Sequence, residues 1–244
     1  MNGDVTYIEW KQWDKEKFAS MRLGSLFYFG QMFRSIVRHQ SNILEIGFGN
    51  GELLGYFAAQ GHSVIGVEIN DHLIERANES GFVAYKGCVS EIPELQHHKF
   101  DLIVALDVAE HMNFVELNTL FYWARNHLCD SGRLYLRFPE GASPFGLANQ
   151  NGDFTHVTAL TRPKIEALCS GNDLNLVSYS DDILSSNKLC SIGFIGKLLL
   201  LLLQWCARVL KKILSIVFFP ISTSMSFATN SIAIISISNN DKIT

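Results

Sequence analysis

The sequence has little of what would place a protein outside the cell or on a nucleic acid. Its five cysteines are scattered and form no Cys-x-x-Cys pair, which predicts reduced thiols in a cytoplasmic protein. The net charge is only −4, so no overall positive charge favours nucleic-acid binding, and we expect none. Residues 1–17 contain acidic side chains and no apolar run, and we therefore expect no secretory signal there.

Charged residues are also scarce. They make up 18% of the chain against 48% for hydrophobic residues, which excludes a disordered protein and predicts a sizeable core. A length of 244 residues suits one α/β domain better than two. We expect a helical lead-in over residues 1–40 and a single domain over residues 41–244, without internal repeats.

Short apolar strands alternate with amphipathic helices along most of the chain. We expect strands at residues 42–47, 63–68, 82–86, 100–106, 133–138, 174–180 and 231–238. We expect helices at residues 51–60, 70–80, 114–128 and 162–169, with a loop at 140–153. Helices between successive strands indicate a parallel sheet covered on both faces. The prediction is a Rossmann-like, doubly wound, seven-stranded sheet, mostly parallel, with its last strand antiparallel.

A glycine-rich turn, ILEIGFGNG, follows the first expected strand. Glycines there let a ligand approach the backbone closely. The last small residue of the dinucleotide pattern GxGxxG is replaced by Glu52. Glu45, two positions before the first glycine, would repel a pyrophosphate but not a cationic amino-acid ligand. Glu68 ends the second strand, where an acid can accept both hydroxyls of a ribose.

With ILEIGFGNG, VIGVEIN and KFDLIVALDVAEHM, the chain resembles class I S-adenosylmethionine-dependent methyltransferases over residues 40–182 and the last strand. The resemblance implies an S-adenosylmethionine site in which the glycine-rich turn holds the amino-acid portion, Glu68 binds the ribose and Ile69 packs on the adenine. It also implies an adenine-contacting turn at 87–89 and an acid beside the sulfonium. The implied cofactor-binding residues are Glu45, Gly47, Phe48, Gly49, Gly51, Glu68, Ile69, Cys88, Val89 and Asp107. The alternative is a doubly wound domain that binds another ligand or none.

Asp107, Glu110 and His111 follow the fourth expected strand, and His156 lies in a later loop over the same edge of the sheet. In one use, His111 or His156 accepts a proton from a substrate hydroxyl beside Asp107. In the other, Glu110, His111 and His156 bind a divalent ion such as Mg²⁺, which holds and acidifies a hydroxyl. A third possibility is purely structural, with Glu110 bridging locally and His111 packing beside the pocket.

The Glu-His pair after this strand resembles that of ubiquinone-pathway O-methyltransferases. Small-RNA ribose 2′-O-methyltransferases use a related Glu-x-x-Glu-His with a later histidine to bind a metal, although the first acid here is Asp107. Methyltransferases of bacterial surface-polysaccharide clusters are similar in the His-Val pair at 156–157 and in a basic, apolar stretch before the last strand.

Residues 190–222 form an apolar insertion before the last strand. Within 196–219 the polar side chains fall on one narrow helical stripe, at Lys197, Gln204, Arg208, Lys211, Lys212 and Ser215. Basic residues near the middle make a transmembrane span costly, whereas a basic stripe on an apolar helix favours the interface of an anionic membrane. The alternative is packing on the domain or on a second subunit of a homo-oligomer.

Together these features predict an O-methyltransferase at the inner face of the membrane. The expected acceptor is a sugar hydroxyl of a cell-surface glycan or its lipid-linked precursor. A quinone-precursor hydroxyl is the runner-up, because it also needs membrane access. A non-catalytic, membrane-associated Rossmann-like partner protein is the alternative of another class.

Overall fold

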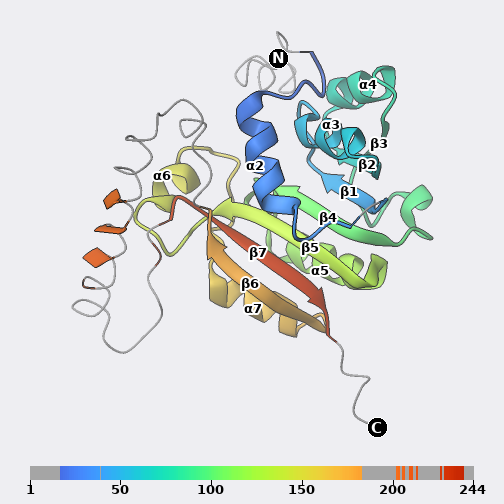
Figure 1. Ribbon diagram of the computed structural model, residues 1–244. Helices are drawn as coiled ribbons and strands as arrows, with labels where there is room; N and C mark the ends of the chain where they lie inside the picture. The colour runs from blue at the N-terminus through green and yellow to red at the C-terminus, as the bar shows by residue number, and fades with distance from the viewer. Residues whose placement is uncertain are drawn as a thin grey trace.

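The computed structural model describes residues 17–38, 40–182 and 228–238, with residues 202, 203, 205, 206, 209, 210, 213 and 226 between them. One sheet of seven strands runs through this part of the chain in the order β3-β2-β1-β4-β5-β7-β6 (Figure 1). The strands are β1 (Asn42–Ile46), β2 (Ser63–Glu68), β3 (Val83–Lys86), β4 (Phe100–Leu106), β5 (Leu128–Pro139), β6 (Leu174–Asp181) and β7 (Asn230–Ile237).

The pairing of the strands confirms the predicted fold. Strands β1 to β5 pair in parallel, and β7 pairs antiparallel with both β5 and β6. The strand order reverses between β1 and β4, and an open α/β sheet binds its ligands at the carboxyl ends of the strands beside such a reversal. The glycine-rich turn after β1 and the acidic segment after β4 both lie at this edge.

Helices cover both faces of the sheet (Figure 1). On one face lie α2 (Leu23–Phe33), α3 (Glu52–Ala59) and α4 (Asp71–Glu79), and on the other lie α5 (Phe114–His127) and α7 (Arg162–Ser170). Apolar side chains that alternate along a strand contribute to the core on both faces of the sheet. In β1, Ile43 packs with α2 and α3, whereas Leu44 belongs to the cluster under α5 and α7. The side chains of Ile43 and Leu44 are both fully buried.

Polar caps define where two of these helices begin. Asn70 precedes α4 and its side chain accepts a hydrogen bond from the backbone N–H of Leu73. Asn113 and Glu116 form a reciprocal capping box at the start of α5. Helix α5 therefore begins directly after the segment that carries Glu110 and His111.

The expected loop at 140–153 is wrong in one respect, because it contains the short helix α6 (Gly146–Asn151). The hydroxyl of Ser143 accepts hydrogen bonds from the backbone N–H groups of Phe145 and Gly146, which supports the first turn. Glycine and asparagine favour loops in general, but this local hydrogen bonding and the burial of Gln150 outweigh their weak helix propensity.

Most of the insertion at 190–222 lies outside the described residues. Those described within 202–213 are in helical conformation and exposed. The large apolar side chains among them are exposed by 40–60%: Leu202, Leu203, Trp205, Val209, Leu210 and Ile213. Within the part of the chain that the structure describes, no helix is long and apolar enough to cross a membrane.

Candidate functional site

The glycine-rich turn joins β1 to α3 in a conformation that requires glycine. Gly47, Gly49 and Gly51 have φ angles of +69°, +53° and +73°, in the left-handed region. A Cβ atom at Gly47 would also lie 2.4 Å from Cγ2 of Val108, which belongs to the segment after β4. The turn and the segment after β4 therefore pack directly against each other.

Glu45 is a buried carboxyl at this turn. It is 5% exposed, and its Oε2 has no hydrogen-bond partner among the described residues. Burial, and then the nearby charge of Glu68, raise the pKa of Glu45 well above its usual value. A buried acid with an unpartnered oxygen suits a cationic ligand, such as the amino group of S-adenosylmethionine, because a positive charge would favour its ionised form.

The Glu68 carboxylate lies at the same turn and is held by backbone N–H groups. One oxygen accepts from the N–H of Gly49 at 3.2 Å, and the other accepts from the N–H of Ile69 at 2.8 Å. Ile69 is 77% exposed. An oriented carboxylate beside an exposed apolar side chain is suitable for a ribose and an adenine ring, and these two roles remain predictions.

Three other predicted cofactor residues have different surroundings. The side chains of Phe48 and Val89 are buried in core clusters, so only their backbones could contact a cofactor. Cys88 is exposed, and its Sγ lies 3.2 Å from the hydroxyl oxygen of Ser90. The sequence pattern identified the turn but could not separate side-chain from backbone contacts.

Asp107 directly follows β4 and has φ = +55°, a sparsely populated conformation for a residue other than glycine. Its carboxylate forms a two-point ion pair with Arg137 of β5, in which Nε donates to Oδ1 at 3.0 Å and Nη2 donates to Oδ2. Sequence reasoning missed Arg137. The signal was available, because a charged residue within the apolar run Leu134–Phe138, near the carboxyl end of a buried strand, calls for a partner.

The structure brings together the three predicted metal ligands. Glu110 and His111 belong to the 3₁₀ turn η3 (Ala109–His111), and His156 comes from the connection between α6 and α7. The imidazole rings of the two histidines are 4.6 Å apart, and Nε2 of His156 lies 3.9 Å from Oε1 of Glu110. One ligand atom from each of the three residues lies within 4.8 Å of the other two.

Glu110 is the most constrained group of this cluster. It is fully buried, and neither carboxyl oxygen has a hydrogen-bond partner among the residues described. Burial, and then the charge of Asp107, raise the pKa of Glu110 to about 8. Without a positive partner the carboxyl is therefore mostly protonated at neutral pH.

Hydrogen bonds place a hydrogen on Nδ1 of both imidazole rings. The hydroxyl of Thr155 donates its single hydrogen to Asp153 Oδ1 at 2.6 Å, so it can only accept from Nδ1 of His111, 2.9 Å away. Nδ1 of His156 lies 3.2 Å from the carbonyl oxygen of Gln150, which can only accept. Both rings therefore carry a hydrogen on Nδ1. In a neutral ring this leaves the lone pair on Nε2, a tautomer suited to metal binding or to proton acceptance.

Asp153 stays ionised in this arrangement. Burial alone would raise its pKa, but hydrogen bonds from the hydroxyl and the backbone N–H of Thr155 outweigh it and lower the pKa below the usual value. An ionised Asp153 keeps the Thr155 hydroxyl oriented, and Thr155 in turn orients His111.

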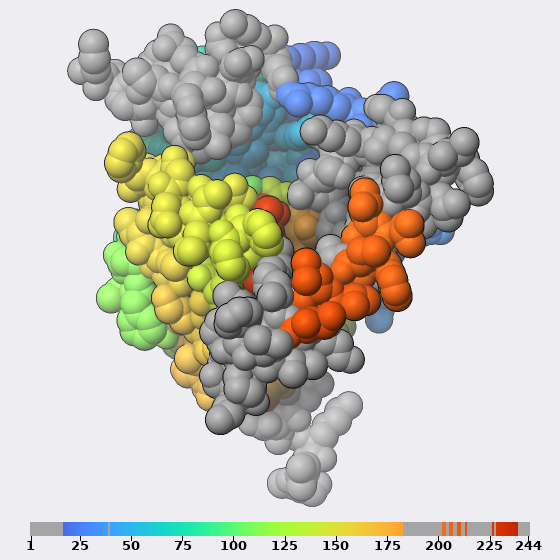
Figure 2. All heavy atoms as spheres, turned by 90° about the vertical axis from the view of Figure 1, so that its left-hand side faces the viewer, coloured from blue at the N-terminus to red at the C-terminus, as the bar shows by residue number. Residues whose placement is uncertain are grey.

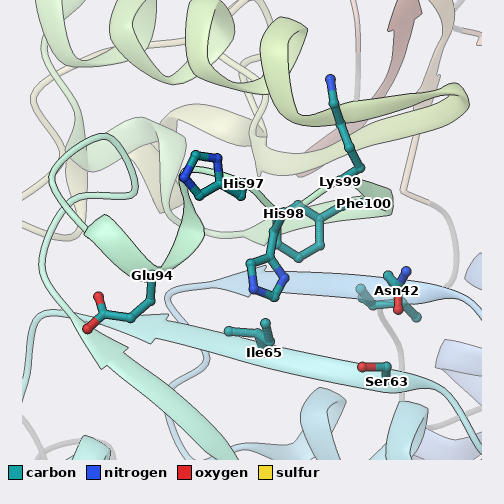
Figure 3. Close-up of a pocket in the computed structure, with 9 residues that line it drawn as sticks. Asn42, Ser63, Ile65, Glu94, His97, His98, Lys99 and Phe100 are labelled. Atoms are coloured by element: carbon teal, nitrogen blue, oxygen red, sulfur yellow. The ribbon is translucent and has the colours of Figure 1, made fainter.

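A separate cavity of about 490 Å³ lies at the opposite edge of the sheet, at the amino ends of β1, β2 and β4. Figure 3 shows His98 beside Ile65 and Phe100 in this cavity. The His98 ring stacks on Phe100 with centroids 5.8 Å apart. Because it lies away from the carboxyl ends of the strands, we do not assign this cavity to the candidate site.

The family model described as a methyltransferase domain matches residues 25–179, more than half of the chain. The chain belongs to this methyltransferase family. It is an S-adenosylmethionine-dependent methyltransferase of class I, which agrees with the buried Glu45 and the glycine-rich turn.

Solved methyltransferase structures share its fold at low sequence identity. A methyltransferase from Archaeoglobus fulgidus, described as dependent on S-adenosylmethionine, is 17% identical with a TM-score of 0.60, covering 87% of this chain and 93% of its own. A TehB-like methyltransferase from Corynebacterium glutamicum is 16% identical with a TM-score of 0.57, covering 96% and 97%. The CcbJ methyltransferase from Streptomyces caelestis is 11% identical with a TM-score of 0.60, covering 93% and 94%. Among curated proteins, none matches the chain.

Proposed function

We propose that this methyltransferase methylates a hydroxyl oxygen, and that Glu110, His111 and His156 hold a divalent ion such as Mg²⁺ beside that hydroxyl. The observation that carries the proposal is the buried carboxyl of Glu110, which has no hydrogen-bond partner among the described residues and lies against His156. A buried carboxylate is costly unless a positive charge compensates it. Carboxylate and imidazole ligands together suit a divalent ion.

The chain's own residues have distinct parts in this chemistry. Bound S-adenosylmethionine supplies an electrophilic methyl group, and a bound divalent ion supplies a Lewis acid that lowers the pKa of a hydroxyl. In the metal-bound form each histidine would hold the ion through its Nε2 lone pair, and the proton that the hydroxyl loses would pass to solvent. Asp107 contributes an oriented carboxylate at the end of β4. Proton acceptance by a histidine without a metal is the alternative, and the same tautomers support it.

For the acceptor we propose a sugar hydroxyl of a cell-surface glycan or its lipid-linked precursor, with a quinone-precursor hydroxyl as the alternative. Helix α6, its N-cap and the loop that carries His156 also expose large apolar side chains. Phe145 is 58% exposed, Leu147 44%, Phe154 fully and Val157 63%. An apolar rim beside the site suits an acceptor with an apolar portion.

We also propose that the enzyme is peripheral on the inner face of the membrane. Figure 2 shows the connection after β5 and the described residues of 202–213 on the same face of the molecule. The sequence between 183 and 225 contains five basic side chains and no acidic one, which favours anionic lipid. A second subunit covering this face is the alternative.

Calorimetric titration with S-adenosylhomocysteine, with and without Mg²⁺, tests the enzyme proposal. We expect saturable binding that Glu68→Ala abolishes. We also expect Mg²⁺ to bind the wild-type protein, and Glu110→Gln and His111→Ala to abolish that binding. His97→Ala, at the opposite edge of the sheet, is the matched control and should leave both titrations unchanged.

The outcomes separate the alternatives. Cofactor binding without Mg²⁺ binding would reject the metal and leave a histidine as the base. No cofactor binding at all would favour a non-catalytic partner protein that has kept the fold.

Sedimentation with vesicles tests the membrane proposal. We expect binding to vesicles that contain anionic lipid, little binding to neutral ones, and a loss of binding in Lys211→Glu. Lys99→Glu introduces the same charge change at the opposite edge of the sheet and should bind like the wild type. Equal binding of both variants would contradict the membrane proposal and favour a second subunit.

A further inference from the structure

Arg137 makes more contacts with Asp107 than an ion pair requires. Its guanidinium donates to both carboxylate oxygens of Asp107, and its backbone carbonyl accepts from the N–H of Asp107 at 2.9 Å. Arg137 therefore restrains both the side chain and the left-handed backbone of Asp107. Its side chain is only 17% exposed, against 43% for Asp107, so the open side of the pair is the aspartate.

The third nitrogen of the Arg137 guanidinium points away from Asp107 and contacts helix α2. Nη1 donates to the hydroxyl oxygen of Tyr28 on α2 at 2.7 Å, and that hydroxyl donates to Asp182 Oδ2 at 2.7 Å. The guanidinium also lies over the Tyr28 ring, 5.7 Å from its centroid. Asp182, which directly follows β6, is 5% exposed. The chain of contacts thus connects β4, β5, α2 and the end of β6.

We propose that Arg137 is a positioning residue that orients Asp107 at the cofactor edge, and that Tyr28 links this pair to α2. A carboxylate on a flexible stem binds a ligand more weakly than one held in place, because binding must first order it. A two-point arginine fork fixes both the position and the plane of the carboxylate, which a lysine cannot do. The inference rests on the proposed contact between Asp107 and S-adenosylmethionine.

A double-mutant cycle tests the positioning role without any methyl acceptor. The dissociation constant of S-adenosylhomocysteine is measured by calorimetry for the wild type, Asp107→Asn, Arg137→Gln and the double variant. We expect each single variant to bind about tenfold more weakly, in the range of a charge-assisted hydrogen bond. We expect the double variant to bind no more weakly than Asp107→Asn, because Arg137 acts only through Asp107.

Conservative variants separate positioning from general stability. Arg137→Lys should recover only part of the affinity. Tyr28→Phe should weaken cofactor binding by about threefold in the wild type, because Arg137 loses its hydrogen bond to the Tyr28 hydroxyl. In Arg137→Gln the same change should have no further effect. Arg133→Gln is the matched control on β5, since among the described residues that side chain bonds only the carbonyls of Ser131 and Gly132. Thermal melts of all variants show which of them remain folded.

Each result supports or overturns a different statement. If Asp107→Asn binds like the wild type, the proposed contact of Asp107 with the cofactor is wrong. If Asp107→Asn weakens binding and Arg137→Gln does not, the contact stands and the positioning role is wrong. Losses that multiply in the double variant would also overturn it, since independent residues give that result. A lower melting temperature of Arg137→Gln with unchanged affinity would show a structural role only.

Discussion

Replacing Glu110 by glutamine should make the metal-free protein more stable at alkaline pH. The folded-state pKa of Glu110 is raised from 4.5 to about 8, so the folded protein holds a proton there that the unfolded chain releases. A group with a raised folded pKa makes folding less favourable as the pH increases from the unfolded value towards the folded one. Glutamine stays neutral throughout and removes this pH dependence.

The magnitude follows from the two pKa values. One pKa unit corresponds to about 1.4 kcal/mol, so the full difference between 4.5 and about 8 amounts to about 5 kcal/mol of unfolding free energy. Most of it, about 3 kcal/mol, is lost between pH 5 and pH 8. Because Glu110 is fully buried, solvent screening removes little of this effect.

Urea denaturation of the wild type and Glu110→Gln at pH 5 and pH 8, in the presence of EDTA, measures the effect. We expect the variant's advantage in unfolding free energy to grow by about 3 kcal/mol between the two pH values. Glu94→Gln, at an exposed carboxylate, should show no such trend. Added Mg²⁺ at pH 8 should stabilise the wild type and not Glu110→Gln. An advantage that is the same at both pH values would refute the raised pKa and with it the reasoning about this cluster.

Three further changes test other parts of the structure. Gly47→Ala should destabilise the fold by roughly 1–3 kcal/mol, because the new Cβ meets Val108 and the left-handed backbone is strained; an unchanged melting temperature would contradict this. Thr155→Val should weaken Mg²⁺ binding about tenfold with unchanged affinity for S-adenosylhomocysteine, because His111 loses the hydroxyl and keeps only the longer contact with the backbone carbonyl of residue 155; calorimetry with both ligands measures this, and equal losses for both would indicate general damage instead. Phe154→Ser should reduce sedimentation with anionic vesicles and leave cofactor affinity unchanged, since the side chain is fully exposed; wild-type sedimentation would remove Phe154 from the proposed membrane face.

The sheet could be predicted from the sequence because its strands are short apolar runs with clear ends. Residues 43–46 are apolar except for Glu45. The glycines that follow directly after them end the strand. Helices of two to four turns between strands leave parallel pairing as the simple solution, and the register of β1 with β2 and β4 agrees with it. The position of the cofactor edge then follows from the strand order.

The helix α6 could not be predicted in the same way. Its six residues are Gly-Leu-Ala-Asn-Gln-Asn, and half of them favour turns. It forms because Ser143 supports its first turn and because Gln150, within the helix, is buried, and both depend on where the chain returns after β5. The carbonyl of Gln150 also bonds His156, so a feature invisible in the sequence orients one of the candidate ligands.

Partners far apart in the sequence decide what the polar residues after β4 can do. The spacing of Glu110 and His111 left a catalytic base, a metal ligand and a structural role open, because sequence spacing does not show which distant residues lie beside them. In the fold, 44 residues separate His111 from Thr155, whose hydroxyl determines the His111 tautomer. A carboxyl that bridged locally would have found a backbone N–H, as Glu116 does at Asn113. Glu110 instead is buried against the imidazole of His156, and neither of its carboxyl oxygens has a hydrogen-bond partner of good geometry among the described residues, which is why we propose a bound cation.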